Sequence, residues 1–294
     1  MMLRTVIRDC LFLNWALPAE SLPEPPEPLR YELHTADGRS YVFASAVLFH
    51  QDAIHLTSFP LLRVCYPQLN LRLHVLDSEG TPSVLFRKML MPVWMVPGVR
   101  LVTHQPASHA RLDFPRPSRD GGGSWRWRAR REGRLDVRAW QAAPVIGEGP
   151  RLGSWDETVR YFQERQRGYA ESAGTLHRLE ASRPSFAAAW PLRAEIGAHD
   201  LLSRMLPLHR SGNGRADGQE NGSWPPLHSV WLCPEIPFVF ELAAVPRVAM
   251  APSIPQPAAG RVASPVLRSD ALPPEGVVSE LVPELRSERR RASC

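Results

Sequence analysis

Thirty of the 294 residues are prolines, about twice the usual share. A proline inside a helix removes a backbone hydrogen-bond donor and clashes with the preceding turn. So many prolines therefore exclude a bundle of long helices. Hydrophobic residues make up 44% of the chain and charged residues 22%, which is enough apolar material for a core. The composition therefore predicts a globular protein built mainly from short strands and loops.

Two segments have a composition that does not form a core. Residues 248–294 contain seven prolines and no aromatic residue, so they bury too little apolar surface to offset the entropy of ordering. Residues 211–223 are rich in glycine, asparagine and serine, as surface loops are. We expect one folded domain over residues 1–247 with a loop insertion, followed by a disordered tail over residues 248–294.

Short alternating segments dominate the expected domain. Asp37-Gly38, between two such segments, predicts a β-hairpin. Ser154-Trp-Asp-Glu157 is a capping-box pattern that predicts one helix over residues 155–169. The expected strands cover residues 30–35, 41–48, 69–76, 84–90, 99–104, 109–114, 125–130, 135–140, 175–181 and 238–245. This pattern predicts a mainly β fold, a barrel or double sheet with one main flanking helix.

One strand carries a row of polar side chains. In residues 68–75 the leucines and Val75 point to one side, whereas Gln68, Asn70, Arg72 and His74 point to the other. The row is either a solvated face or a set of hydrogen-bonding groups inside a barrel mouth. Arginine favours the second interpretation because its planar fork binds carboxylates through two hydrogen bonds. Gln68, Asn70 and Arg72 are therefore the candidate ligand-binding residues.

Two histidines, His104 and His109, flank residues 105–108 and are expected at strand ends on the barrel rim. Histidine there could act as an acid or base near neutral pH, although such rings more often hydrogen-bond to the backbone. The pair lacks a third metal ligand at a diagnostic spacing, and the four cysteines have no zinc-type spacing. We expect neither a metal nor a cofactor.

Positive charge is concentrated in residues 116–138, where eight arginines face three acidic residues, a net charge of +5 that equals the formal charge of the whole chain. Within this segment, residues 124–130 alternate tryptophan and arginine. Period two places the two residue types on opposite faces, whereas single-strand nucleic-acid binders need both on one surface. We expect buried tryptophans, solvated arginines and no nucleic-acid partner.

No apolar run approaches the roughly 20 residues that span a bilayer, and the first residues lack the features of a signal peptide. The expectation is a cytoplasmic protein without a membrane partner. The sequence makes no prediction about the oligomeric state.

Several motifs in a fixed order resemble those of the YqjF-like family of uncharacterised bacterial proteins, over roughly residues 3–247. They are Phe-Leu-Asn-Trp at 12–15, the hairpin at 37–38, Gln-Leu-Asn-Leu-Arg at 68–72, residues 103–112, the helix with Glu164-Arg165, Trp-Pro-Leu at 190–192 and Pro-Leu-His-Ser at 226–229. The resemblance implies a fold related to acetoacetate decarboxylase.

The chain departs from the chemistry of those decarboxylases, in which a lysine of lowered pKa forms a Schiff base with a keto acid. The segment around Gln105, where the lysine-bearing turn would align, contains no lysine. Gln68 stands where the resemblance implies a glutamate. The only lysine, Lys88, lies on an earlier strand and is expected to face solvent. We therefore expect no imine chemistry.

Three functions fit these features. The first is binding of a small anionic or carbonyl-containing ligand in the barrel cavity without Schiff-base chemistry. The second is a non-catalytic interaction protein that uses its basic hairpin and tail. The third is a lyase or hydrolase that uses His104 or His109. The sequence leaves open whether the protein is an enzyme.

Overall fold

The computed structural model describes residues 2–117, 123–172, 174–182, 189–208 and 224–241. The predicted loop insertion at 211–223, the tail at 248–294 and the domain boundary between 247 and 248 all lie outside the described residues. Strands dominate the described part of the chain, as the fold-class prediction requires.

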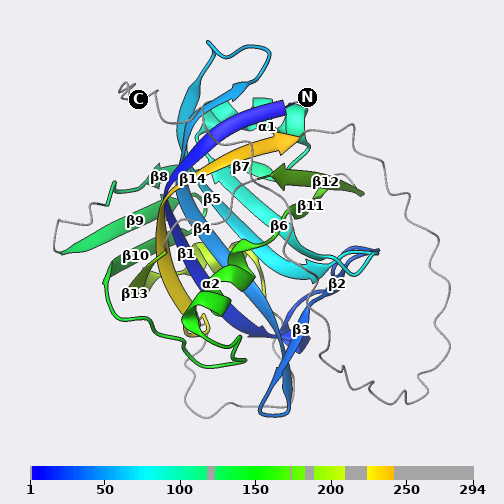
Figure 1. The fold of residues 1–294 in the computed structure, drawn as a ribbon, viewed down its shortest axis with the longest axis vertical. Coiled ribbons are helices and arrows are strands. Elements are labelled where there is room, and N and C mark those ends of the chain that lie inside the picture. Colours follow the sequence, from blue (N-terminus) through cyan, green and yellow to red (C-terminus); the bar gives the residue numbers. More distant parts are fainter. Residues whose placement is uncertain (1, 118–122, 173, 183–188, 209–223, 242–294) are drawn as a thin grey trace, which may run out of the picture. The chain divides into compact units, whose positions relative to one another are not determined.

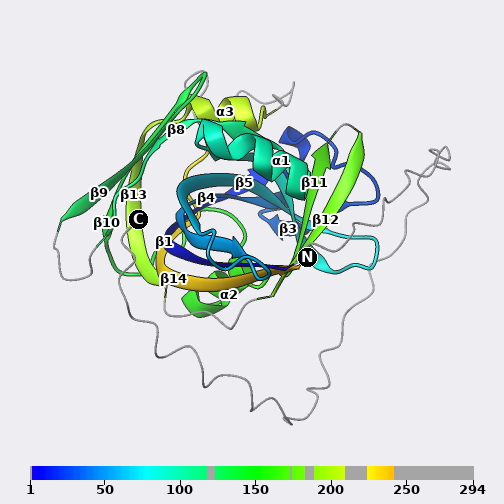
Figure 2. The ribbon, with the colours of Figure 1, turned by 90° about the horizontal axis from the view of Figure 1, so that it is seen from above.

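Seven strands pair in a closed ring, which makes a barrel (Figures 1 and 2). In ring order they are β1 (Met2–Pro18), β4 (Arg39–Leu56), β5 (Val64–Leu76), β6 (Pro82–Met91), β11 (Arg167–Ser172), β12 (Thr175–Ser182) and β14 (Ser229–Glu241). All neighbours are antiparallel except β6 and β11, and β14 closes the ring by pairing with β1 from Met2 to Asn14. Ring closure leaves these strands with one face inside and one outside the barrel.

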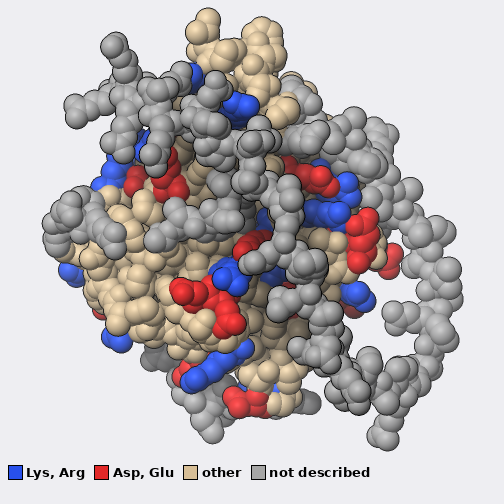
Figure 3. Space-filling view, in the orientation of Figure 1, with Lys and Arg blue, Asp and Glu red and all other residues tan. Residues whose placement is uncertain are grey.

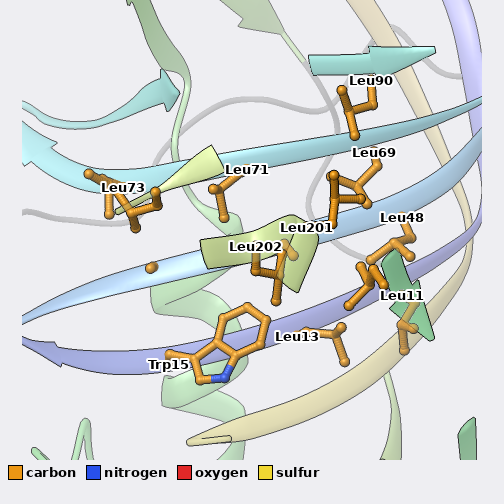
Figure 4. Close-up of a cluster of buried hydrophobic side chains, with 14 of the residues drawn as sticks. Leu11, Leu13, Trp15, Leu48, Leu69, Leu71, Leu73, Leu90, Leu201 and Leu202 are labelled. Carbon is orange, nitrogen blue, oxygen red and sulfur yellow. The ribbon is translucent and has the colours of Figure 1, made fainter. Parts of the chain in front are cut away.

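A second layer covers the outer face of β1, β4, β5 and β6. It consists of β13 (Trp190–Ala198), β10 (Arg134–Gln141), β9 (Ser124–Arg130), β8 (Arg111–Asp113) and helix α3 (Asp200–Met205). The two layers share one large cluster of buried side chains. Figure 4 shows part of it, with leucines from four barrel strands and from α3 directed toward one another. This cluster is the main hydrophobic core.

Short elements complete the fold: β2 (Arg30–Tyr31), β3 (Leu33–Ala36), β7 (Ala107–His109) and two 3-10 turns, Ala19–Ser21 and Val93–Met95. The predicted hairpin is confirmed, because β3 pairs with β4 across Asp37 and Gly38. Both residues have positive φ, 48° and 72°, which is the conformation of the tight turns that Asp-Gly favours.

Two helices differ from the prediction. Residues 99–104 were expected to be a strand, but they lie in or just after helix α1 (Val96–Thr103). The run is short and apolar, so its period does not separate strand from helix, whereas Pro97 in the first turn is a helix-start signal. Helix α2 (Trp155–Gln163) has the expected capping box but ends six residues early. Gly168 lies instead in β11, where a Cβ would come within 2.5 Å of the Phe86 ring.

Among the described residues, no helix has the length and apolar character needed to span a membrane.

Candidate functional site

The inside of the barrel contains a cavity of about 330 Å³, within the usual range of about 300–1,000 Å³ for small-molecule sites. Most of its lining is aliphatic or aromatic, including Phe12, Val47, Phe49, Ile236 and Phe238. Side chains of α1 and of the loop between β4 and β5 line one end. In Figure 1 these segments lie at the upper end of the barrel and α2 lies lower down.

The polar row of β5 reaches into this cavity. Gln68, Asn70 and Arg72 are all in its lining, while the alternating leucines of β5 point outward into the main core. Gln68 Nε2 donates a hydrogen bond to Asn70 Oδ1 at 2.7 Å. Arg72 Nη2 donates to the Phe162 carbonyl of α2 at 2.9 Å, and its guanidinium lies 5.2 Å from the centre of the Phe12 ring. The three predicted residues therefore lie together along one wall.

The fourth member of the row, His74, is closed off from the cavity by α2. Its ring stacks on Tyr161 at 5.2 Å and meets the edge of Phe162 at 5.0 Å. Burial, followed by the nearby charges of Arg165 and Arg72, holds the pKa of His74 well below its usual value. His74 is therefore a neutral, structural ring beneath the polar end of the cavity.

Arginines are the charged residues of the cavity wall. Arg72, Arg165 and Arg167 line it, and within the described ranges no Asp or Glu does. Arg165 is anchored by an ion pair with Glu32 at 2.8 Å. Arg167 is anchored by Asp77 at 2.8 Å, from the β5–β6 turn. The carboxylates that hold these two arginines thus stand behind the wall, and the cavity presents cationic and neutral polar groups at its inner end.

The opposite end of the cavity is surrounded by exposed apolar side chains. Phe59 and Leu62 of the β4–β5 loop contribute to the lining and are 65% and 72% exposed. Three more apolar side chains are also exposed: Leu61 in the same loop, Trp94 in the 3-10 turn before α1 and Leu101 in α1. In Figure 3 the projections at the upper end of the molecule are uncharged. The cavity is therefore apolar toward its mouth and polar toward α2.

The two candidate catalytic histidines lie elsewhere. His104 is exposed, ends α1 in the left-handed conformation and stacks on His177 with ring centres 4.8 Å apart. His109 is exposed at the end of β7. Neither lines the cavity, and a catalytic role for them stays a prediction that nothing in the cavity geometry supports. The cavity is also lined by glutamines that no sequence pattern marked, including Gln51, Gln105 and Gln163.

The basic hairpin has the expected two faces. Trp127 is fully buried, whereas Arg126 and Arg130 are exposed on the opposite face. Arg126 makes a two-pronged ion pair with Asp136, which neutralises part of the concentrated charge. No group of three or more potential metal ligands occurs in the described residues.

Lys88 differs from its predicted position in solvent. It lies on the outer face of β6, opposite Leu71, where it is partly buried. Because β7 pairs with β6 at Met89 and Ala107, the 105–108 segment runs beside Lys88 and covers it in part. The lysine is thus close to the turn where the resemblance would place one, but it is on the outside of the barrel.

Solved structures show the fold class. Enduracididine biosynthesis enzyme MppR with HEPES buffer bound matches with a TM-score of 0.53 and 12% identity, over 84% of this chain and 87% of that one. The same enzyme complexed with pyruvate matches with a TM-score of 0.51 and 11% identity, over 81% and 87%. An acetoacetate decarboxylase-like enzyme from Sphingomonas wittichii RW1 has a TM-score of 0.46 and 13% identity, over 84% and 92%. The chain shares its mainly β fold with MppR, in agreement with the predicted fold class.

The sequence shows the family. The profile of DUF2071, described as an uncharacterized conserved protein, matches residues 4–205, and the chain belongs to this family. This agrees with the resemblance given by its ordered motifs. No curated protein matches the chain.

Proposed function

We propose that the barrel cavity binds an amphiphilic organic anion, with a carboxylate at Arg72 and an apolar body extending toward α1. The observation that carries the proposal is the wall itself: in the described residues it contains arginines and no carboxylate. An arginine fork in a cavity of low dielectric attracts a carboxylate more strongly than it would in water.

The neighbours of Arg72 fit this orientation. Gln68 and Asn70 can donate to a ligand oxygen from the same wall, and Phe12 holds the guanidinium from one side. The aromatic and aliphatic residues farther along the cavity match a hydrocarbon part. The solved MppR structure complexed with pyruvate offers a precedent for a small carboxylate with this fold.

The ligand is proposed to bind without forming an imine. A Schiff base needs a neutral amine in contact with the ligand carbonyl. The cavity wall has no lysine among its described residues, and Lys88 projects from the outside of the barrel. Arginine does not substitute, because its guanidinium stays protonated.

The test compares saturated monocarboxylates of increasing length with the primary alcohols of equal length, using calorimetry on the full chain. Affinity should rise about fourfold per methylene, the equivalent of about 0.8 kcal/mol, until the cavity is filled. Arg72→Gln should weaken carboxylate binding by about tenfold or more and leave alcohol binding nearly unchanged. The control Arg193→Gln changes an exposed arginine of the second layer and should have no effect.

Equal affinity for carboxylates and alcohols in the wild-type protein would overturn the proposal. Arg72 also binds α2, so thermal unfolding must accompany each variant. If Arg72→Gln unfolds, Arg72→Lys keeps the charge and should retain part of the preference for carboxylates.

A further inference from the structure

A second hollow, of about 350 Å³, lies outside the barrel where β6, α1, β7 and β11 meet. Lys88 enters it from β6 and Arg100 from α1, while Ser108 and Ser172 bring hydroxyl groups from β7 and β11. Lys88 and Arg100 lie close together in the sequence, whereas Ser172 comes from β11, so the fold brings a hydroxyl group from a distant strand to the two cations.

The geometry holds these groups in place. Arg100 Nε donates to the Ala107 carbonyl at 2.8 Å, which fixes the guanidinium at the edge of the hollow. The position of Lys88 is set by β6, because Lys88 is paired with Leu71 of β5. In the described part of the chain, Lys88 makes neither a hydrogen bond nor an ion pair. A rigid arginine and a lysine therefore face the same space.

Gln105 supplies an independent observation. Its side chain is 97% buried, being only 3% exposed, and lines the hollow. Within the described residues, neither Gln105 Oε1 nor Gln105 Nε2 has a hydrogen-bond partner. A buried amide left in this state is destabilising, and hydrogen bonds to a bound ligand would offset that cost.

We propose that this hollow is a binding site for a phosphate-type dianion, held by Lys88 and Arg100 with hydrogen bonds from Ser108, Ser172 and Gln105. Two cations and three neutral donors match the charge and the acceptor oxygens of a phosphate group. Glu171 also lines the hollow, but it is exposed, so water and salt screen its repulsion of a bound anion. Gln105 also lines the cavity, but the site does not depend on the function proposed for the cavity.

The electrostatic surroundings of Lys88 support the site. Burial, followed by the charges of Arg131 and Arg100, lowers the pKa of Lys88, and Glu132 opposes this shift. An anion bound between the cations would relieve their repulsion. Binding should therefore raise the pKa of Lys88.

The chain's single lysine makes the test direct. Reductive methylation with ¹³C-formaldehyde keeps the charge and labels Lys88 and the α-amine, so NMR gives one signal from the site and one internal control. Titration with inorganic phosphate should shift the Lys88 signal to saturation and raise its pKa. Sodium chloride at equal ionic strength should do neither, and the α-amine should respond equally to both salts.

A second arm replaces inorganic phosphate by glycerol phosphate. Saturable binding in either arm supports the site, and the tighter arm shows whether the ligand is free or esterified phosphate. Arg100→Gln should weaken binding by about tenfold, whereas Arg193→Gln should not. Equal responses to phosphate and chloride, or equal losses in the two variants, would overturn the proposal.

Discussion

The two faces of the barrel wall are buried in different ways. On the outside, a whole second sheet covers the strands, and Leu69, Leu71 and Leu73 pack against it with no exposed surface. On the inside, one helix of nine residues closes only one end, and the remaining space is the cavity. The same strands thus carry a filled core on one face and a binding space on the other. A sheet can cover a sheet completely, whereas a short helix covers only the area of its own apolar stripe.

The largest expected difference between the two faces is in the cost of removing a leucine. Leu71→Ala should destabilise the protein by about 3 kcal/mol, because it creates a closed void in the filled core. Leu179→Ala should cost about 1 kcal/mol, since Leu179 is only partly buried and already borders open space. Urea unfolding measures both. Similar losses would mean that the cavity is packed as tightly as the core.

Acid should weaken the packing around α2, where three histidines contact Tyr161 or Phe162. Burial lowers the pKa of His74, His34 and His228 in the folded state, so the unfolded chain takes up protons that the folded chain does not. Stability is therefore retained above about pH 6.5 and falls below it, by about 1.4 kcal/mol per pH unit for each fully excluded proton.

His74→Phe tests this dependence on acid. Phenylalanine keeps the ring contacts with Tyr161 and Phe162 but does not titrate. The dependence of the unfolding free energy on pH between 6.5 and 5 should therefore decrease by about 1.4 kcal/mol per pH unit, the contribution of one proton. Urea unfolding across this range provides the measurement. Parallel curves for the variant and the wild type would show that His74 is not the group responsible.

The smallest effect concerns the helix that closes the barrel. Ser154 Oγ accepts a hydrogen bond from the Glu157 backbone, and Glu157 accepts one from the Ser154 backbone at 2.7 Å. Ser154→Ala should cost about 1 kcal/mol and speed hydrogen exchange in α2 more than in β10. Glu157→Gln keeps an acceptor and should cost less. Uniform acceleration across both elements would contradict a local role for the cap.

Local patterns predicted the parts of the fold that local forces decide. The Asp37-Gly38 turn, the Ser154 cap and the two faces of the 68–75 strand depend on neighbouring residues, and the structure has all three. The 17-residue strand β1 was missed, since its long apolar stretch has no period and is extended only because β4 and β14 pair with it. Strand β13 was missed as well.

The candidate site was predictable to a similar extent. Alternation placed Gln68, Asn70 and Arg72 on one face, and the structure puts that face inside the barrel. Sequence spacing gave no signal for Gln163 or Gln105, because they reach the cavity only after α2 and α1 pack onto it. His104 and His109 showed the opposite failure: they are close in sequence but exposed, and they do not converge on the cavity.

Gln105 has a further consequence because its side chain borders both hollows. An anion accepts hydrogen bonds but donates none, so an anion in the outer hollow would hold the amide nitrogen and fix a side chain that also lines the cavity. Each ligand would then meet a glutamine whose position depends on the other ligand, and the two affinities would be coupled. Linkage requires the factor to be the same in both directions, so a single coupling free energy would describe how one buried glutamine connects the inside of the barrel with its outer surface.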